Sequence, residues 1–588
     1  MKHTETLGVD TGAEGVIFLA QCLDEMLYEY TAANYKPRVV GLQALTIEAE
    51  AVIGRVEAGA MDRARLYPIL DELRNRLHSD SVAKSLLSFQ FDYYCSYLRE
   101  EPLKAISVRL GLLKNALGRG RYRKSLEHEI IRLCVKPTEK FLIIDSLRQW
   151  VSTVSRMGFS GRFLRSKVLT EFFEPTIKYR SAADLAIFFR IFDAEKSKFE
   201  IVFFASRIVD DLSSVMSRFS FVLVESSGPI FVADDGTEVI LSENERVVKV
   251  SGVEARDIFS ARTLAEHRLE HLSDMFALFH HKNRLSWRAE AVVKEDGGSS
   301  CVVQARPTSV KRSRDNLPRR ASEKMAAKIS DLSFSDRESV SRFVSVVRLH
   351  GAALEAASPQ AQIVNLWTAM EVLVSRDSDS KLRGVKKCLM PFLVHGYFDR
   401  LLFGLAGDLY RWKRRAVSKL LKKVDLPGWS QHHKLALLLL GGDLEPERDS
   451  LYTLVSAYPL LRNRVFKISK TIAKPESLIT VVDGHRERVY WQIERIYRAR
   501  NFIVHDGSAP PHIDALAENS HEYLDAFVDR FMILCADYKV VSTLDEAISH
   551  QTKMYEDWIS VLTSAKGKEI TKENIRSLCA LDSKASRD

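Results

Sequence analysis

The residues best suited to chemistry in this sequence are Arg500, Asn501 and His505. They lie close together and directly precede Asp506 and Gly507. A guanidinium binds phosphate oxygens, and an imidazole exchanges a proton near neutral pH. A phosphate-binding cation beside such a residue is the minimum equipment for cutting RNA without a metal.

Spacing alone does not single out this site, because Arg123 with His128 and Arg262 with His267 repeat it. The surrounding sequence is more informative. From about Arg486, apolar residues recur at helical spacing, and Gly507 then stands where a C-terminal cap glycine belongs. We therefore expect Arg500 and His505 to lie on the last turns of a helix.

Helical geometry adds a requirement to this site. At about 100° per residue, Arg500 and His505 lie about 140° apart around one straight helix, whereas Asn501 and His505 share a face. Either the terminal turn bends or a second copy of the helix faces the first. Arg498 also fits the spacing to His505 and is a rival for the phosphate-binding role.

A second predicted helix begins with a serine cap at Ser358 and Pro359 in the first turn. Glu371 follows Trp367 by four residues, at the edge of the apolar side of this helix. A carboxylate there costs free energy unless it is paired. Glu371 therefore belongs either to a structural ion pair or to a site.

A cationic segment lies between these two helices. Net charge is +9, from 86 basic and 77 acidic residues, which alone does not indicate a nucleic-acid partner. The distribution is more telling, since seven cations occur without an anion at Arg411, Lys413, Arg414, Arg415, Lys419, Lys422 and Lys423. Such a cluster can hold an RNA backbone, but a solvated helix face or an acidic protein partner explains it equally well.

The elements that must position these residues divide the chain into several regions. At 588 residues it is too long for one hydrophobic core. We predict a mainly α protein with a central α+β module: a mostly helical region at 1–195, the module at 196–306, a basic linker at 307–330, a helical domain at 331–565 and a polar tail at 566–588. The module is expected to contain two hairpins, with turns at Asp234–Gly236 and Glu295–Gly298.

Several classes of protein do not fit the sequence. The seven cysteines are scattered singly, so neither a disulfide framework nor a metal site is expected, and no cofactor is predicted. No apolar run reaches the ~20 residues needed to span a bilayer. The N-terminal Met1–Thr6 lacks the basic start of a signal peptide. A cytoplasmic protein without a membrane partner fits these features best.

Two segments of the chain, Asn365–Leu373 and Arg500–Gly507, resemble the HEPN superfamily, and within it the ApeA-like HEPN domains of bacterial anti-phage proteins. The resemblance covers about residues 335–563 and rests on the Trp367-to-Glu371 helix and the Arg-Asn-x-x-x-His helix. Residues 1–306 resemble no family that we can name.

The resemblance implies a C-terminal HEPN-type helical bundle and a metal-independent endoribonuclease that acts in antiviral defence by abortive infection. HEPN domains pair, so a homodimer would bring two motifs around one cleft. His505 would be general base or acid, Arg500 would stabilise charge on phosphorus, Asn501 would orient the phosphate or the imidazole, and Glu371 would hold Arg500 or His505 in position. The products would be a 2′,3′-cyclic phosphate and a 5′-hydroxyl.

The same resemblance implies that the N-terminal regions sense infection, through a phage-encoded trigger, and control the nuclease. Two alternatives stay open. One is a non-catalytic HEPN-like module that binds RNA or a nucleotide, and the other is a scaffold that docks on an acidic partner through residues 411–423.

Overall fold

The structure is a computed structural model that describes residues 14–31, 35–36, 40–97, 100–118, 120–174, 179, 181–225, 230–312, 316–374, 380–424 and 426–581. The N-terminal Met1–Thr6 and residues 582–588 of the predicted tail lie outside this range.

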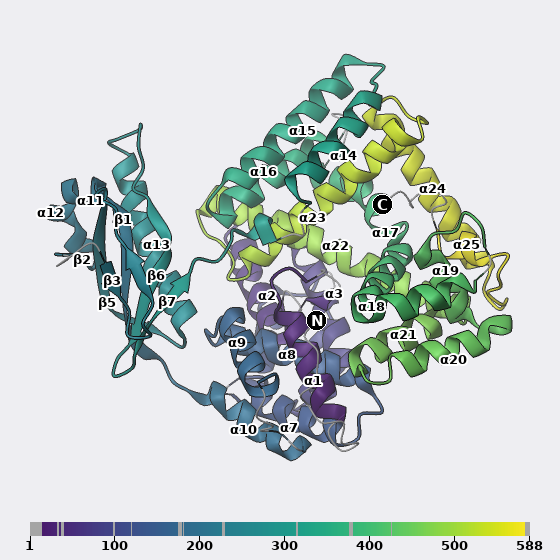
Figure 1. The fold of residues 1–588 in the computed structure, drawn as a ribbon, viewed down its shortest axis with the longest axis horizontal. Coiled ribbons are helices and arrows are strands. Elements are labelled where there is room, and N and C mark those ends of the chain that lie inside the picture. Colours follow the sequence, from purple (N-terminus) through teal and green to yellow (C-terminus); the bar gives the residue numbers. More distant parts are fainter. Residues whose placement is uncertain are drawn as a thin grey trace. The chain divides into compact units, whose positions relative to one another are not determined.

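Within the described residues the protein is mainly α-helical and contains a five-stranded antiparallel sheet with a separate two-stranded hairpin (Figure 1). This confirms the predicted class, mainly α with a central α+β module. The chain divides into two compact units: unit 1 comprises Met1–Ala44 and Leu117–Pro307, and unit 2 comprises Leu45–Ala116 and Thr308–Asp588. The predicted boundaries differ, because residues 45–116 pack with the C-terminal half rather than with the rest of 1–195.

The helical part of unit 1 is built around aromatic side chains. Trp150 is fully buried and contacts the rings of Phe188, Phe189 and Phe192. The helices that supply this core and its surroundings are α1 (Glu14–Leu27), α7 (Arg121–Val135), α8 (Lys140–Arg156), α9 (Gly161–Phe172) and α10 (Leu185–Arg190).

The sheet of unit 1 has the strand order β2-β5-β1-β6-β7. Alternation along β1 divides its side chains between two faces: Phe199, Ile201 and Phe203 join the core that contains α13, whereas Val202 and Phe204 pack with residues of the small hairpin. The elements are β1 (Ser197–Ser206), β2 (Phe221–Val224), β3 (Ile230–Val232), β4 (Glu238–Ile240), β5 (Glu245–Ala255), α13 (Ile258–Ala277), β6 (Trp287–Glu295) and β7 (Ser300–Gln304). Both predicted hairpins, β3–β4 and β6–β7, are confirmed.

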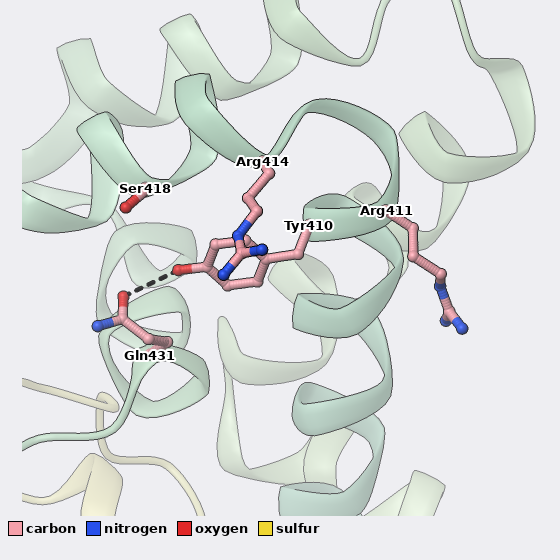
Figure 2. Close-up of a pocket in the computed structure, with 5 residues that line it drawn as sticks. All are labelled: Tyr410, Arg411, Arg414, Ser418 and Gln431. Carbon is pink, nitrogen blue, oxygen red and sulfur yellow. Dashed lines mark hydrogen bonds between the residues drawn. The ribbon is translucent and has the colours of Figure 1, made fainter. Parts of the chain in front are cut away.

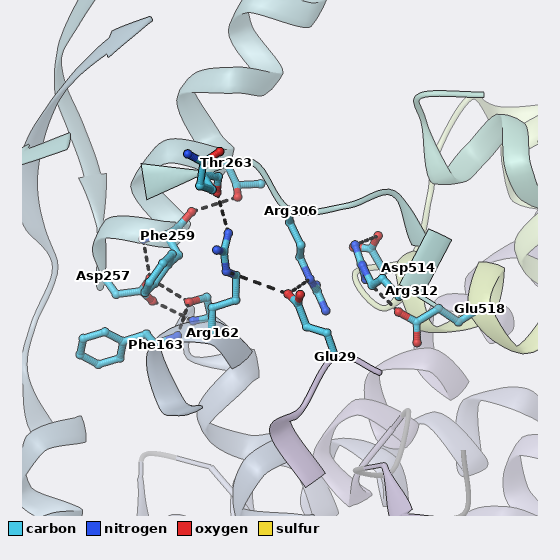
Figure 3. A network of polar contacts seen from close by, with 12 residues as sticks. Glu29, Arg162, Phe163, Asp257, Phe259, Thr263, Arg306, Arg312, Asp514 and Glu518 are labelled. Atoms are coloured by element: carbon cyan, nitrogen blue, oxygen red, sulfur yellow. Dashed lines mark hydrogen bonds and ion pairs between the residues drawn. The ribbon is translucent and has the colours of Figure 1, made fainter. Parts of the chain in front are cut away.

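Polar contacts tie the helical part of unit 1 to its α+β part (Figure 3). The carboxylate of Asp257 caps α13 by accepting from the backbone amides of Phe259 and Ser260, and it also accepts from the backbone and hydroxyl of Ser160 at the start of α9. Arg306 pairs with Glu29 at 3.1 Å. These contacts are local to unit 1.

Unit 2 is helical throughout the part that the structure describes. Its central element is α22 (Pro475–Asp506), which packs against α3, α16, α17, α21, α23 and α24. Its helices are most of α2 (Leu42–Glu57), α3 (Tyr67–Ser79), α4 (Ser81–Ser85), α5 (Phe91–Cys95), α6 (Leu103–Ala116), α14 (Pro318–Asp331), α15 (Arg337–Glu355), α16 (Pro359–Val372), α17 (Lys381–Val394), α18 (Tyr397–Lys422), α19 (Gln431–Leu440), α20 (Glu445–Leu454), α21 (Pro459–Ile472), α22, α23 (Ile513–Met532), α24 (Leu544–Ser564) and α25 (Ile575–Leu578).

Two segments of unit 2 that we predicted to be a linker and a polar tail contain helices. The supposed linker at 307–330 contains α14 and, before it, Arg312, which is buried and pairs with Asp514 and Glu518 (Figure 3). The supposed tail contains α25, whose Ile575 and Leu578 are buried, and Trp558 of α24 donates to the carbonyl of Leu578. The few apolar residues of this C-terminal segment are therefore sufficient to pack it against the rest of unit 2.

A search of the described helices for a membrane span finds none with the length and apolar character that crossing a bilayer requires.

Candidate functional site

The candidate catalytic residues lie on the last two turns of α22. This helix begins at Pro475, earlier than predicted, and ends at Asp506, where the cap Gly507 has a left-handed φ of 60°. The amide of Ser508 donates to the carbonyl of Phe502 and that of Gly507 to Ile503, a pattern that closes a helix C-terminus. The predicted glycine cap is confirmed.

The helix does not bend before its cap. It runs without interruption through Arg500 and His505, so the two side chains leave it about 140° apart. Of the two ways to bring them together, a bent terminal turn is therefore excluded. Within this one chain, no local bend of the helix brings the two side chains together.

The positive charge of Arg500 is not paired with a carboxylate among the described residues. It is half-buried, and its Nη1 donates to Oδ1 of Asn501 at 3.1 Å. Its Nε is buried without a hydrogen-bond partner, and no carboxylate among the described residues pairs with it. His505 is exposed and also has no hydrogen-bond partner in the described part of the chain. Both groups are thus available to an outside ligand.

Arg498, the rival for the phosphate role, is placed differently. It is 1% exposed, and its Nη2 pairs with Oε1 of Glu48 at 2.7 Å. Arg495 pairs with the same Glu48 at 3.0 Å and with Glu72. Burial opposes ionisation of Glu48, but the two arginines outweigh it and lower its pKa to about 2. Arg498 thus belongs to a buried ion cluster, and a role in binding RNA does not fit its position.

In the other two Arg-to-His patterns, the arginine is also buried and paired within the protein. Arg123 is buried and bonds to Asp193 and to the carbonyl of Phe192. Arg262 is buried and pairs with Glu266. Position therefore distinguishes Arg500 from both, where spacing could not.

Sequence reasoning missed one cation near the site. Arg55 of α2 lies over the ring of Phe502 at 3.5 Å, and its Nε pairs with Asp506 at 2.8 Å. Its Nη2 also donates to the hydroxyl of Ser508. No local signal could have linked residues this far apart in the chain. Arg55 fixes the end of α22 on both sides of His505.

Glu371 lies on α16, whose Ser358 cap is confirmed by the bond from the amide of Ala361. Its Oε1 accepts from the indole of Trp367 at 2.7 Å, and the Trp367 ring contacts Tyr497 of α22. No hydrogen bond or ion pair joins Glu371 to Arg500 or His505 within the described residues. Its observed contact is structural, because it orients the tryptophan that packs on α22.

The seven cations of the basic segment are all exposed, on the C-terminal part of α18 and at Lys423 just beyond it. Two of them are paired, Arg411 with Asp408 and Lys423 with Glu447. Lys413, where the backbone leaves helical geometry, has a φ of −144°. For Lys413, Arg414, Arg415, Lys419 and Lys422, no carboxylate partner occurs in the described residues. We call these seven residues the basic face.

A pocket with a volume of about 510 Å³ opens on the basic face (Figure 2). It is lined by Tyr410, Arg411, Arg414, Ser418 and Gln431. The hydroxyl of Tyr410 donates to Oε1 of Gln431 at 3.0 Å. The guanidinium of Arg414, the ring of Tyr410 and the neutral polar groups are side chains that a nucleotide phosphate and its base would contact, whereas the Arg411 guanidinium points away and pairs with Asp408 (Figure 2).

No family model, no curated protein and no solved structure matches this chain. Its function is therefore inferred from the side chains at the end of α22 and on the basic face.

Proposed function

We propose that the protein is a metal-independent endoribonuclease of antiviral defence, in which Arg500, Asn501 and His505 of paired HEPN-type bundles cut RNA. The observation that carries the proposal is the state of Arg500. It is a half-buried arginine without a carboxylate partner in the described structure, bonded to Asn501, on a helix where the nearby Arg498 is buried and paired with Glu48. The resemblance of this motif to HEPN nucleases supplies the reaction.

In this reaction an imidazole of His505 takes the proton from a ribose 2′-hydroxyl, and the resulting oxygen attacks phosphorus. The bond from phosphorus to the 5′-oxygen breaks, that oxygen takes up a proton from water, and the protonated His505 returns its proton to water. Arg500 stabilises the charge that builds on the phosphoryl oxygens. The products are a 2′,3′-cyclic phosphate and a 5′-hydroxyl.

Cleavage in EDTA by the purified protein tests the assignment. We expect His505→Ala and Arg500→Ala to lower the rate by at least 10²-fold, the usual contribution of a general base or a charge-stabilising group. Arg486→Ala is the matched control, because Arg486 lies on the same helix and, among the described residues, pairs with Asp483 at the surface. Equal cleavage by all four proteins would refute the catalytic role.

Mixing the two inactive variants tests the pairing of copies. If each site takes Arg500 from one copy and His505 from the other, a mixed dimer contains one intact site. Random exchange makes about half of the dimers mixed, so about a quarter of the parental activity should return. A mixture as inactive as its components would place both groups in one copy or show that the motif is not catalytic.

The basic face is proposed to hold the RNA backbone. Neutralising Arg414, Arg415 and Lys419 to glutamine should weaken RNA binding and reduce the slope of log affinity against log salt by about 2, at about 0.7 per single-strand phosphate contact. The exposed Lys553, Lys566 and Lys568, changed together to glutamine, remove the same charge elsewhere on unit 2. Equal effects of the two triple variants would reduce the basic face to a general charge effect.

A non-catalytic RNA-binding module is the second candidate, favoured by the pocket at Tyr410 and Arg414, which could bind RNA without the α22 motif. The role of unit 1 as a sensor is also proposed. Expression of the parent and of His505→Ala during phage infection separates the candidates. Loss of cellular RNA and arrest of growth with the parent alone support the nuclease, and equal protection by both proteins supports binding.

A further inference from the structure

A cluster of two imidazoles and one carboxylate lies in unit 2 and takes no part in the proposed reaction. Nε2 of His432 lies 3.2 Å from Oδ1 of Asp399, and Nε2 of His433 lies 3.1 Å from the same oxygen. The two histidines are the second and third residues of α19, and Asp399 is in the first turn of α18. Three potential ligand atoms thus converge from two helices.

From this convergence we propose that Asp399, His432 and His433 bind a divalent transition metal, Zn²⁺ by preference. Imidazole nitrogen and carboxylate oxygen are common zinc ligands, with bonds of about 2.0–2.2 Å. A tetrahedral ion with such bonds separates its ligand atoms by roughly 3.3 Å. The observed separations of 3.1 and 3.2 Å need little change to admit the ion.

The surroundings support the ligand set. The side chains of His432 and His433 are 7% and 3% exposed, and that of Asp399 is 13% exposed. The hydroxyl of Ser430 lies 3.1 Å from Nδ1 and 3.5 Å from Nε2 of His432, so it adds a polar contact beside this ring. The rings of Phe403 and Trp429 contact His432 and His433 edge-on and restrict their rotation.

A metal here would connect α18 to the start of α19. Gln431, which lines the pocket on the basic face, directly precedes His432, so the ion would also fix one wall of that pocket. The three protein ligands leave one coordination position open to water, unlike the four-ligand zinc sites that only hold a fold together. In this proposal the ion holds α18 and α19 together, and RNA cleavage does not pass through it.

The competing explanation is purely hydrogen-bonded, with both Nε2 atoms donating protons to one Asp399 oxygen. It predicts no affinity for zinc. Another cluster, His350, His521 and Asp525, has a more open carboxylate, 43% exposed, and can contribute a second, weaker equivalent. The experiment therefore counts equivalents site by site.

The full-length protein, stripped of metal and titrated with Zn²⁺ by calorimetry, tests the proposal. We expect one tight equivalent that is lost in His433→Gln and in Asp399→Asn and retained in His350→Gln and in His271→Gln, the last an exposed histidine of unit 1. Zn²⁺ should also raise the Tm of the parent, and EDTA should reverse that rise. If a variant does not fold, the change in the Tm of the parent with Zn²⁺ and EDTA still tests the proposal.

Either of two results overturns the proposal. One is a parent protein that binds no tight equivalent and shows no change of Tm with Zn²⁺. The other is an equivalent that persists undiminished in both folded variants of the cluster.

Discussion

Among the arginines near the end of α22, position decides what each residue can do. Arg498 and Arg495 share Glu48 inside unit 2, whereas Arg500 is half-buried and free of carboxylates among the described residues. The difference between Arg498 and Arg500, two positions apart, follows from which face of the helix meets the carboxylates of α2 and α3.

Replacing each of these two arginines by methionine should have different effects on stability and on cleavage. Arg498→Met removes one partner of a buried pair, and we expect the free energy of unfolding to fall by about 3–5 kcal/mol. Arg500→Met breaks no ion pair and should cost about 1 kcal/mol or less, while abolishing cleavage. Urea unfolding measures both, and the double variant Glu48→Met with Arg498→Met should recover part of the loss. Equal costs for the two single variants would contradict this division.

Local signals were sufficient to predict some residues and insufficient for others. The serine cap at Ser358 and the glycine cap at Gly507 were predictable because caps depend on a few adjacent residues. The burial of Arg498 was not, because its partner Glu48 is 450 positions away. Asp399 and His433, 34 apart in sequence, were missed for the same reason.

At the scale of elements, α18 and α22 meet through a stacked pair of rings. Tyr397 and His485 are nearly parallel, with ring centroids 3.6 Å apart, and Nε2 of His485 lies 3.2 Å from the carbonyl of Leu393. Burial, reinforced by the charges of Arg488 and Arg400, lowers the pKa of His485 to about 3. The imidazole is therefore neutral in the folded protein.

This stacking should make the protein sensitive to acid. Below pH 6.5 the unfolded chain protonates His485 while the folded protein does not, so stability falls as pH drops toward 3. His485→Phe keeps a ring on Tyr397 but cannot titrate. We expect its unfolding free energy to fall less steeply than that of the parent, by about 1.4 kcal/mol per pH unit between pH 6 and 4. Parallel curves for the two proteins in urea titrations would contradict the assignment.

At the scale of the whole molecule, the discontinuity of unit 2 is the feature that sequence composition concealed. Residues 45–116 and 308–588 form one unit although 191 residues of unit 1, numbered 117–307, separate them along the chain. Composition suggested contiguous domains, because helical residues of 1–195 look alike whichever unit they join.

The discontinuity predicts the behaviour of fragments. Residues 308–588 alone retain Arg495 and Arg498 but lack Glu48 and Glu72, so we expect the fragment to be insoluble or molten. Coexpression with residues 45–116 should restore a cooperative transition in thermal unfolding. A fragment of 308–588 that unfolds cooperatively by itself would contradict the dependence.

Translation gives the ion cluster at Glu48 a timing. A ribosome makes this glutamate 450 residues before the arginine that neutralises it, and all of residues 117–307 are made in between. The first helices of unit 2 must therefore wait, without their final partners, until the last quarter of the chain emerges. A chain whose synthesis stops before this point contains neither Arg500 nor His505, so under the proposed function such a product cannot cut RNA.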